Sequence, residues 1–537
     1  MGQYLKNAYN TKVTPQTAKI PGSTQVQNNA GGYAWAVDDW QRLKRFLILG
    51  SEGGTYYASE QKLTQENTEA VARCITTNGA RTVKEIVAIS DAGRAPKNDP
   101  ALLALAMCAS SVDQDTRMYA WNALPKVARI GTHLLHFVSY METMRGWGRM
   151  AKNGVGRWYN YMPAEKLAYQ AIKYQSRDAW AQRDLLRLSH PKPIDTTHDA
   201  IYHWLVKGTD GQTLASEPPT DKALTLLWAF EQAKVAVDSK TIVKLITDYN
   251  LPREAIPTVW LKEKDVWAAL LVDMPLTAMI RNLATMTRVE LLAPFADATS
   301  KVIAELTNQD KLTKARVHPV VLLNALKTYQ QGHGDKSSHT WAPVAQIVDA
   351  LDKAFYLSFG NITPTNKRYM LALDVSGSMG MGQIAGMSLN PREASAAMAM
   401  VTVYTESQYM TVAFQNNLTP LTITPRMRLD SIINTIDNLP FGGTDCAQPM
   451  LYALKNKLPI DVFCVYTDSE TWAGAIHPVQ ALQEYRRKMG VDAKLVVVGM
   501  TSGGFSIADP NDKGMLDVVG FDTAMPEMLS MFVRGEI

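Results

Sequence analysis

Apolar residues recur every three or four positions through a long stretch of this chain, from about Asp38 to Phe359. This spacing predicts amphipathic helices, and clear examples are 66–78, 81–91, 99–112, 221–235 and 343–358. Many of the runs begin at Asp, Asn, Thr or Pro and end near Gly or Asn, as helix caps favour. Short helices in such number favour an α-solenoid of degenerate HEAT-like pairs, although a plain multi-helix globule fits the same pattern.

The pattern is different at both ends of this stretch. Residues 1 to about 35 are polar and turn-rich and predict an extended arm. After a polar linker at 360–368, fully apolar strands alternate with helices, which predicts a buried, mainly parallel sheet with helices on both faces. The expected elements are strands at 369–374, 409–414, 418–424, 461–468 and 494–500, and helices at 391–405, 428–438, 447–457 and 477–489. We therefore divide the chain into an all-α region with its arm, 1–362, and a doubly wound α/β domain, 363–537.

Three segments of the α/β domain carry side chains with oxygen atoms that suit a hard metal ion. Asp374, Ser376 and Ser378 follow the first strand, Thr444 lies in the loop FGGTD, and Asp468 ends another strand. Carboxylate and hydroxyl oxygens suit Mg²⁺, with Mn²⁺ as an alternative. The order D-x-S-x-S, T, D resembles the metal-ion-dependent adhesion site of von Willebrand factor A domains. That resemblance implies direct binding by the hydroxyls, water-mediated binding by the two carboxylates, and one position left for a partner's carboxylate.

Positive charge is concentrated in residues 117–192, which hold 13 Lys and Arg against 4 Asp and Glu, whereas the whole chain carries only +4. Aromatic residues are interleaved with these cations, as in grooves that bind single-stranded nucleic acid: Tyr119, Trp121, Trp147, Trp158, Tyr159, Tyr161, Tyr174 and Trp180 are examples. Solvated helix faces and buried aromatics give the same pattern. The candidate RNA-binding residues are Thr132, His133, His136, Arg145, Arg149, Lys152, Arg157, Lys173, Arg177, Arg183, Arg187, His190 and Lys192.

The cysteines, the N-terminal residues and the absence of known catalytic motifs restrict the expected location and class of the protein. The four cysteines form no C-x-x-C pair and indicate a reducing compartment. The first ten residues lack the apolar core of a signal peptide, and no apolar run is long enough to span a membrane, so we expect a cytoplasmic protein without a membrane partner. Phosphate-binding, zinc-protease and serine-hydrolase motifs are absent from the sequence, and we expect no catalytic residues.

Seven stretches of the chain, in order, resemble the sixty-kilodalton Ro (SS-A/Ro) ribonucleoprotein family with its TROVE domain. They are QVQNNAGGYAW (25–35), RIGTHLLHF (129–137), GWGRMAKNGVGRWYN (146–160), RDLLRLSHPKP (183–193), IRNLATMT (280–287), ARVHPVVLLNALKTYQQGHG (315–334) and YMLALDVSGSM (369–379). The resemblance implies a HEAT-repeat ring closed by a von Willebrand factor A domain. It also implies that Y RNAs bind the basic outer surface and that single-stranded 3′ ends of misfolded or unprocessed non-coding RNA enter the central hole.

The resemblance further implies a role in RNA quality control, maturation or decay, and, for bacterial members, exoribonuclease partners. One departure concerns the W-S-H-K-D stretch of animal members, where this chain has Gln182 in place of the histidine. A histidine-specific Y RNA contact is therefore in doubt here, and the divergence is compatible with a bacterial or phage member of the family. The alternative function is a metal-dependent protein-interaction scaffold, in which an acidic protein ligand or an exoribonuclease binds at the metal site.

Overall fold

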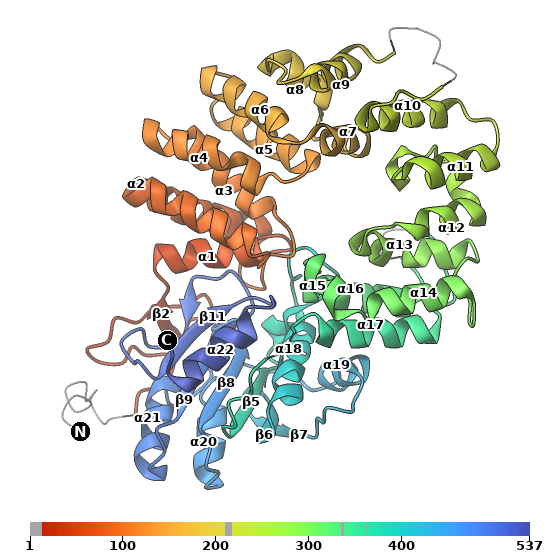
Figure 1. The fold of residues 1–537 in the computed structure, drawn as a ribbon. Helices are drawn as coiled ribbons and strands as arrows, with labels where there is room; N and C mark the ends of the chain where they lie inside the picture. Colours follow the sequence, from red (N-terminus) through yellow and green to blue (C-terminus); the bar gives the residue numbers. More distant parts are fainter. Residues whose placement is uncertain (1–12, 210–216, 335–337, 361) are drawn as a thin grey trace.

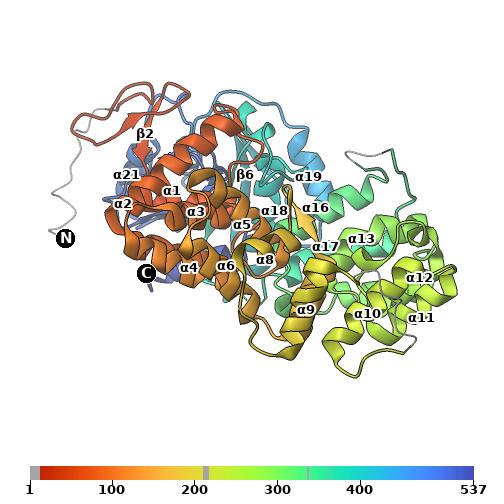
Figure 2. The same ribbon diagram turned by 90° about the horizontal axis from the view of Figure 1, so that it is seen from above.

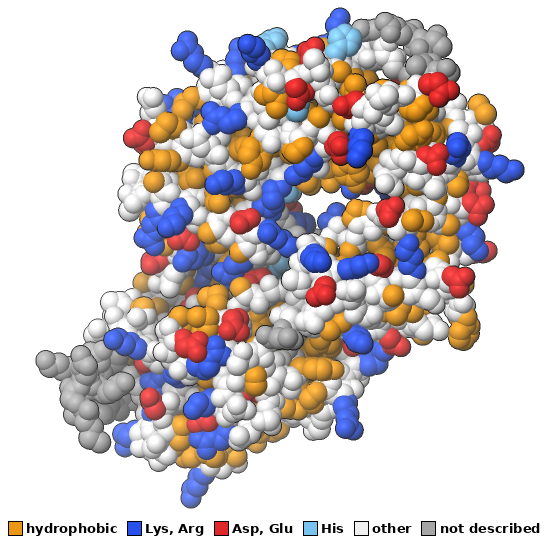
Figure 3. All heavy atoms as spheres, viewed as in Figure 1, with side chains coloured by type: hydrophobic (Ala, Val, Ile, Leu, Met, Phe, Trp, Pro, Cys, Tyr) orange, Lys and Arg blue, Asp and Glu red, His pale blue; other side chains and the backbone are white. Residues whose placement is uncertain are grey.

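The computed structural model describes residues 13–209, 217–334, 338–360 and 362–537, so the first twelve residues of the expected arm lie outside it. Helices α1 to α17 follow one another around a ring, and the C-terminal domain joins its two ends (Figure 1). The space-filling view is open at the centre of this ring (Figure 3). The predicted ring of helices is thus confirmed.

The helices of the ring are short, apart from α2. They are α1 (Asp39–Leu49), α2 (Glu60–Asp91), α3 (Asp99–Ser110), α4 (Gln114–Val127), α5 (Gly131–Met144), α6 (Arg149–Tyr161), α7 (Ala164–Lys173), α8 (Gln182–Ser189), α9 (Thr196–Lys207), α10 (Lys222–Val235), α11 (Ser239–Tyr249), α12 (Lys264–Val272), α13 (Leu276–Arg288), α14 (Asp297–Leu306), α15 (Gln309–Lys314), α16 (Pro319–Gln330) and α17 (Ala345–Leu357). A small hairpin, β3 (Ser176–Arg177) and β4 (Trp180–Ala181), precedes α8.

Local sequence explains where these helices begin and bend. The side chains of Asp38, Asp113 and Asp238 each accept a hydrogen bond from a backbone N–H in the first turn of the helix that follows. The two helices expected at 66–78 and 81–91 are continuous in α2, with a break at Asn78, where φ is −162° and ψ is 91°. Gly79 follows this break, and a Cβ there would lie 1.8 Å from the hydroxyl oxygen of Thr116. The kink therefore lets α2 approach α4 closely.

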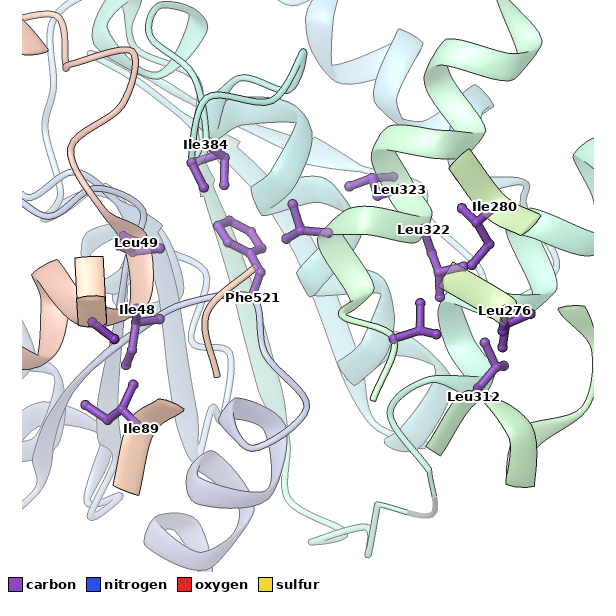
Figure 4. Close-up of a cluster of buried hydrophobic side chains, with 14 of the residues drawn as sticks. Ile48, Leu49, Ile89, Leu276, Ile280, Leu312, Leu322, Leu323, Ile384 and Phe521 are labelled. Atoms are coloured by element: carbon purple, nitrogen blue, oxygen red, sulfur yellow. The ribbon is translucent and has the colours of Figure 1, made fainter. Parts of the chain in front are cut away.

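Polar and apolar contacts both close the ring. The Arg316 side chain donates to the carbonyl of Asp91 at 2.7 Å, and the His318 ring bonds the carbonyl of Arg94 at 3.1 Å. Arg94 also pairs with Asp522 of the C-terminal domain at 3.2 Å. Figure 4 shows the buried Phe521 between leucine and isoleucine side chains from both ends of the ring. Burial of this apolar seam favours the closed form.

The C-terminal domain contains a six-stranded sheet in the order β11-β9-β8-β5-β6-β7, in which only β7 is antiparallel to its neighbour. The strands are β5 (Tyr369–Asp374), β6 (Tyr409–Phe414), β7 (Leu418–Leu421), β8 (Val462–Thr467), β9 (Lys494–Gly499) and β11 (Met515–Val519). The helices are α18 (Pro391–Thr405), α19 (Leu429–Asp437), α20 (Gln448–Lys455), α21 (Pro478–Met489) and α22 (Met525–Arg534). The predicted doubly wound α/β domain is confirmed, and β5, β6 and α18 have the predicted bounds.

Alternate side chains of the central strands enter two separate cores. Met370 and Phe463 pack in one with residues of α20 and α21, whereas Leu371 and Tyr466 belong to the other, with residues of α18, α19 and α22. Both faces of the sheet are therefore covered, which explains why its strands are apolar at nearly every position.

The described part of the arm, residues 13–36, lies against the C-terminal domain in both ribbon views (Figures 1 and 2). Its strand β2 (Tyr33–Ala36) pairs with β1 (Val26–Gln27) on one side and with β10 (Phe505–Ser506) on the other. The arm precedes the helical ring in sequence, but its strand pairing attaches it to the α/β domain.

Candidate metal centre and nucleic-acid interface

The candidate metal centre lies where the sheet order reverses. Strands β5 and β8 are parallel neighbours, and after β5 the chain first builds the β6 side before returning to the β8 side. Asp374 is the last residue of β5, and Asp468 directly follows β8. The carboxyl ends of parallel strands beside such a reversal are a usual place for ligand binding. The structure thus places the two predicted carboxylates on adjacent strands.

The hydroxyl groups of the motif are held next to these carboxylates. The Oγ atoms of Ser376 and Ser378 are 3.2 Å apart, and the Ser376 amide donates to Asp374 at 2.9 Å. The Gly377 amide contacts the carbonyl of Gly442 at 3.4 Å, which brings the FGGTD loop against the serine loop. The five predicted ligands, Asp374, Ser376, Ser378, Thr444 and Asp468, are all buried.

The electrostatics of this edge favour a bound cation. Burial raises the pKa of Asp374, and the nearby charge of Asp468 raises it further. The pKa of Asp468 is also raised by burial. The Arg392 guanidinium donates to the Val375 carbonyl at 2.7 Å and interacts with the Asp374 charge, but burial still dominates and raises the Asp374 pKa. Two buried, mutually repelling carboxylates with three hydroxyls form an oxygen set that fits Mg²⁺ or Mn²⁺.

The described residues contain no cluster of three or more His, Cys, Asp or Glu side chains arranged to hold a metal ion. The oxygen set at the sheet edge relies on hydroxyls instead, and its residues are consistent with one hard divalent cation.

Several side chains near this edge were not recognised from the sequence. Phe441 is 75% exposed and lies next to Gly377, which follows Ser376. Trp472 is 40% exposed and lies next to Gly443, which precedes Thr444. Glu470 is buried two residues after Asp468, and burial together with the Asp468 charge raises its pKa to about 7. Tyr57, in the loop between α1 and α2, has its pKa raised by burial and then by the charges of Asp468 and Glu470. No local motif marks these residues, because tertiary contacts bring them together.

The candidate RNA-binding residues divide by exposure. Thr132, His133, His136 and Lys173 are half-buried. The remaining nine are exposed and lie on α6, on α8 or in the segments that adjoin these helices: Arg145, Arg149, Lys152, Arg157, Arg177, Arg183, Arg187, His190 and Lys192. Lys and Arg side chains are also visible around the central opening in Figure 3. The structure therefore presents a broad cationic surface rather than one compact pocket.

The two histidines on α5 already have protein partners. His133 contacts Asn98 at 3.4 Å, and burial, followed by the charge of Arg129, lowers the pKa of His133 to about 4. Its ring is therefore neutral near pH 7. The His136 ring pairs with Asp178 of the β3–β4 turn and lies 3.8 Å from Asp99. Neither histidine resembles the freely exposed cations that surround it.

The aromatic residues of 117–192 are mostly structural. Trp121, Trp158 and Tyr159 are buried in the ring core, whereas Tyr119 and Tyr161 are exposed at 46% and 65%. The expectation of stacking surfaces is therefore wrong for the three buried rings. Their spacing matches a core-facing helix stripe, a pattern that sequence alone does not separate from a stacking platform.

Gln182 is also part of the core. Its side-chain oxygen accepts from the hydroxyl of Tyr159, and its amide donates to the carbonyl of Tyr174 at 3.1 Å. The residue is only 2% exposed. Its neighbour Arg183 is exposed at the start of α8. In this chain the position is occupied by a buried structural residue, which supports the doubt about a histidine-type RNA contact.

Within the described residues, no helix combines the length and the apolar character needed to cross a lipid bilayer.

Comparison with known proteins agrees with both parts of the fold. Residues 26–328 match the TROVE domain, and residues 368–533 match the Ro60 vWA domain. The chain is 43% identical over 537 residues to RNA-binding protein RO60 of Deinococcus radiodurans, with 99% of both chains covered. It is 37% identical to RNA-binding protein RO60 of Caenorhabditis elegans, with 98% of this chain and 92% of the relative covered.

Solved structures give the same result. The crystal structure of the Deinococcus radiodurans RO (RSR) protein matches with a TM-score of 0.71 at 43% identity, covering 93% of this chain and 100% of that chain. The family resemblance expected from the sequence is confirmed across nearly the whole chain. A helical ring that matches the TROVE domain, joined to an α/β domain that matches the Ro60 vWA domain, places this chain in the Ro60 family.

Proposed function

We propose that this protein binds RNA, as the names of its relatives state for them. The observation that carries the proposal is the set of eight exposed Lys and Arg side chains, together with His190, on α6, α8 and the segments next to them. Phosphate contacts from such a surface supply affinity without reading sequence. A broad surface of this kind suits a folded RNA whose backbone crosses several helices.

The central opening suggests a second mode of binding. We infer that structured Y-type RNAs lie on the basic outer surface, whereas single-stranded 3′ ends of misfolded or unprocessed non-coding RNA enter the ring. A closed ring threads a free single strand more readily than a duplex. The protein would then select RNAs with unpaired ends for quality control, maturation or decay. Binding and selection require no catalytic residue of the protein itself.

The threading step has a direct test. A linear RNA with an unstructured 3′ tail and the same sequence ligated into a circle are compared for binding to the full chain. We expect the linear RNA to bind more tightly. We also expect the logarithm of each binding constant to fall linearly with the logarithm of salt concentration, because phosphate contacts release counterions. Equal binding of circle and linear RNA would exclude threading while leaving surface binding intact. Salt-independent binding would contradict the phosphate-contact proposal itself.

A second function is favoured by the exposed aromatic side chains beside the candidate metal centre. We propose that Asp374, Ser376, Ser378, Thr444 and Asp468 hold a divalent cation, Mg²⁺ or Mn²⁺. When bound, the cation supplies an electrophilic position for a carboxylate from an acidic protein ligand, such as an exoribonuclease. Phe441 and Trp472 would contact apolar groups next to that carboxylate. EDTA should abolish such protein binding and spare RNA binding, whereas loss of both without unfolding would contradict the separation.

A further inference from the structure

The N-terminal arm follows the candidate metal edge closely. The amide of Thr14 donates to the side chain of Gln480 at 3.1 Å, and the ring of His477 bonds the carbonyl of Ala18 at 2.8 Å. Further along, the arm turns back on itself between β1 and β2. The tip of this turn reaches the loop that begins at Asp468.

The turn holds the loop after Asp468 through buried groups. Glu470 accepts hydrogen bonds from the backbone and side-chain nitrogens of Asn29, at 2.8 and 2.7 Å, and from the Ala30 amide at 3.3 Å. The side chain of Asn28 donates to the carbonyl of Thr471 at 2.8 Å. Asn28, Glu470 and Thr471 are all at most 5% exposed. Removing one member leaves its buried partners without a hydrogen bond, which is costly.

The arm also reaches the loop that carries Thr444. The side chain of Gln16 donates to Asp445 at 2.7 Å and accepts from the hydroxyl of Thr471. The carbonyl of Thr444 in turn accepts from the amide of Trp472 at 3.0 Å. One buried glutamine thus joins the two loops that contain the proposed cation ligands Thr444 and Asp468.

The packing at Gly32 shows how tightly the arm fits. A Cβ at this position would lie 2.0 Å from the carbonyl oxygen of Thr471 and 2.9 Å from the Cα of Trp472. Both atoms are backbone, so neither moves away without shifting the loop. Only glycine permits this approach, and any larger side chain displaces either the arm or the loop.

We propose that the arm is a clamp that positions Thr444 and Asp468 for the divalent cation. This inference rests on the metal site proposed above and adds its positioning residues, Gln16, Asn28 and Asn29. They act through the loops and do not contact the cation themselves. Residues that orient metal ligands commonly alter metal affinity when they are replaced. Because coupling between two binding events is reciprocal, cation binding strengthens arm docking as much as arm docking strengthens cation binding.

The first test replaces residues of the clamp and measures Mn²⁺ affinity of the full chain by isothermal titration calorimetry. Asn29→Ala removes the side-chain hydrogen bond to Glu470 and leaves the backbone one, whereas Gly32→Ala forces the arm and loop apart. We expect each to weaken Mn²⁺ binding by about tenfold or more. Gln27→Ala is the matched control, because this exposed side chain bonds only the Gly31 carbonyl in the same turn. Its Mn²⁺ affinity should stay within about twofold of the parent.

The second test uses the unaltered protein and so does not depend on how the variants fold. Lys19 is an exposed trypsin site within the arm. Mn²⁺ should slow the release of the fragment that begins at Ile20, as followed by mass spectrometry. A variant with Ser376→Ala and Ser378→Ala should lose this protection, which controls for any effect of Mn²⁺ on the protease.

The outcomes separate this inference from the RNA-binding proposal. Unchanged Mn²⁺ affinity in both clamp variants, or a cleavage rate at Lys19 that Mn²⁺ does not alter, would overturn the clamp. A parent protein that binds no Mn²⁺ would overturn both the clamp and the metal site. RNA affinity, measured in parallel, should be unaffected by Asn29→Ala, since the arm lies on the C-terminal domain and the basic segment lies on α4 to α8 of the ring.

Discussion

The two candidate sites of this protein are built in opposite ways. At the candidate metal centre, Asp374 and Asp468 are buried at the ends of adjacent strands, and the Oγ atoms of Ser376 and Ser378 are 3.2 Å apart. The basic segment, 117–192, instead spreads its exposed cations over four helices and the connections between them. When several buried side chains converge on one ligand, the affinity for that ligand depends strongly on each of them. An exposed surface gains affinity from many weak, screened contacts.

The difference determines how each site has to be tested. Single changes at the metal edge leave buried partners unsatisfied and should produce large, local effects. Single changes on the basic surface should produce small effects that add together when the sites are well separated. If substitutions at one site leave ligand affinity at the other unchanged, the two sites are independent. If one substitution alters both affinities, the two sites are coupled.

The largest effect is expected from reversing charge on the basic surface. A variant with Arg145→Glu, Arg149→Glu and Lys152→Glu replaces three exposed cations at the α5–α6 connection and the start of α6. We expect RNA affinity at about 0.15 M salt to fall by roughly 100-fold or more, because three phosphate contacts are lost and repulsion is added. Filter binding or fluorescence anisotropy with a structured RNA measures the change. Mn²⁺ affinity should not change.

The matched control reverses the same amount of charge elsewhere on the ring. Lys240, Lys262 and Lys264 are exposed at or near α11 and α12. Their replacement by Glu should lower RNA affinity much less, through long-range electrostatics alone. Equal losses in the two triple variants would show that net charge, and not the segment 117–192, determines RNA affinity.

The next effect concerns the metal edge. Ser376→Ala together with Ser378→Ala removes two of the five proposed ligand groups. We expect Mn²⁺ affinity to fall by about 100-fold, since the remaining carboxylates and threonine bind too few positions of the cation. RNA affinity should stay within about twofold. Calorimetry with Mn²⁺ and anisotropy with RNA on the same preparation decide whether the two sites are independent.

The two regions also differ in how far sequence predicted them. The proximity of the proposed metal ligands was predictable, because four of them lie at the carboxyl ends of the adjacent strands β5 and β8, where sheet topology brings them together. The aromatic residues of the basic segment were not, because a helix stripe that faces the core has the same spacing as one that faces RNA. Trp121 and Trp158 proved to be core residues.

Long-range contacts explain what the sequence did not reveal. The strand β11 was not anticipated, and its central Asp517 interrupts the apolar pattern that marks the other strands. That carboxylate is paired with the buried Arg45 of α1 at 2.6 Å, a partner 472 positions away. The arm was predicted to be extended, but its docking against Glu470 depends on groups equally distant in the chain. Such pairs leave no periodic signal.

A moderate effect on stability should come from Asp374→Asn. Burial and the Asp468 charge raise the pKa of Asp374, so the folded metal-free protein binds a proton more tightly than the unfolded chain does. Stability without metal therefore falls as pH rises above the ordinary carboxyl range near 4. The neutral side chain removes that penalty, and at pH 8 we expect the free energy of unfolding to rise by about 1–3 kcal/mol. Urea denaturation in EDTA measures this change.

The Asp374 prediction also separates stability from ligand binding. Added Mn²⁺ should stabilise the parent protein and should stabilise the Asn variant little, because a carboxylate of the site is lost. A variant that is less stable than the parent in EDTA at pH 8 would mean that the hydrogen bonds from Ser376 and Thr467 to this carboxylate outweigh its charge penalty.

The smallest effects are expected at Gln182 and Arg183, which are adjacent in sequence but differ in burial. Gln182→His disturbs buried hydrogen bonds to Tyr159 and Tyr174, so we expect a loss of about 1–2 kcal/mol in the free energy of unfolding. RNA affinity should change by less than about twofold, because a side chain at this depth does not reach solvent. Arg183→Gln should do the reverse, weakening RNA binding a few-fold while stability stays within about 0.5 kcal/mol. Tighter RNA binding by the histidine variant would show that this position opens to the surface, and would place an RNA contact within what the structure presents as core.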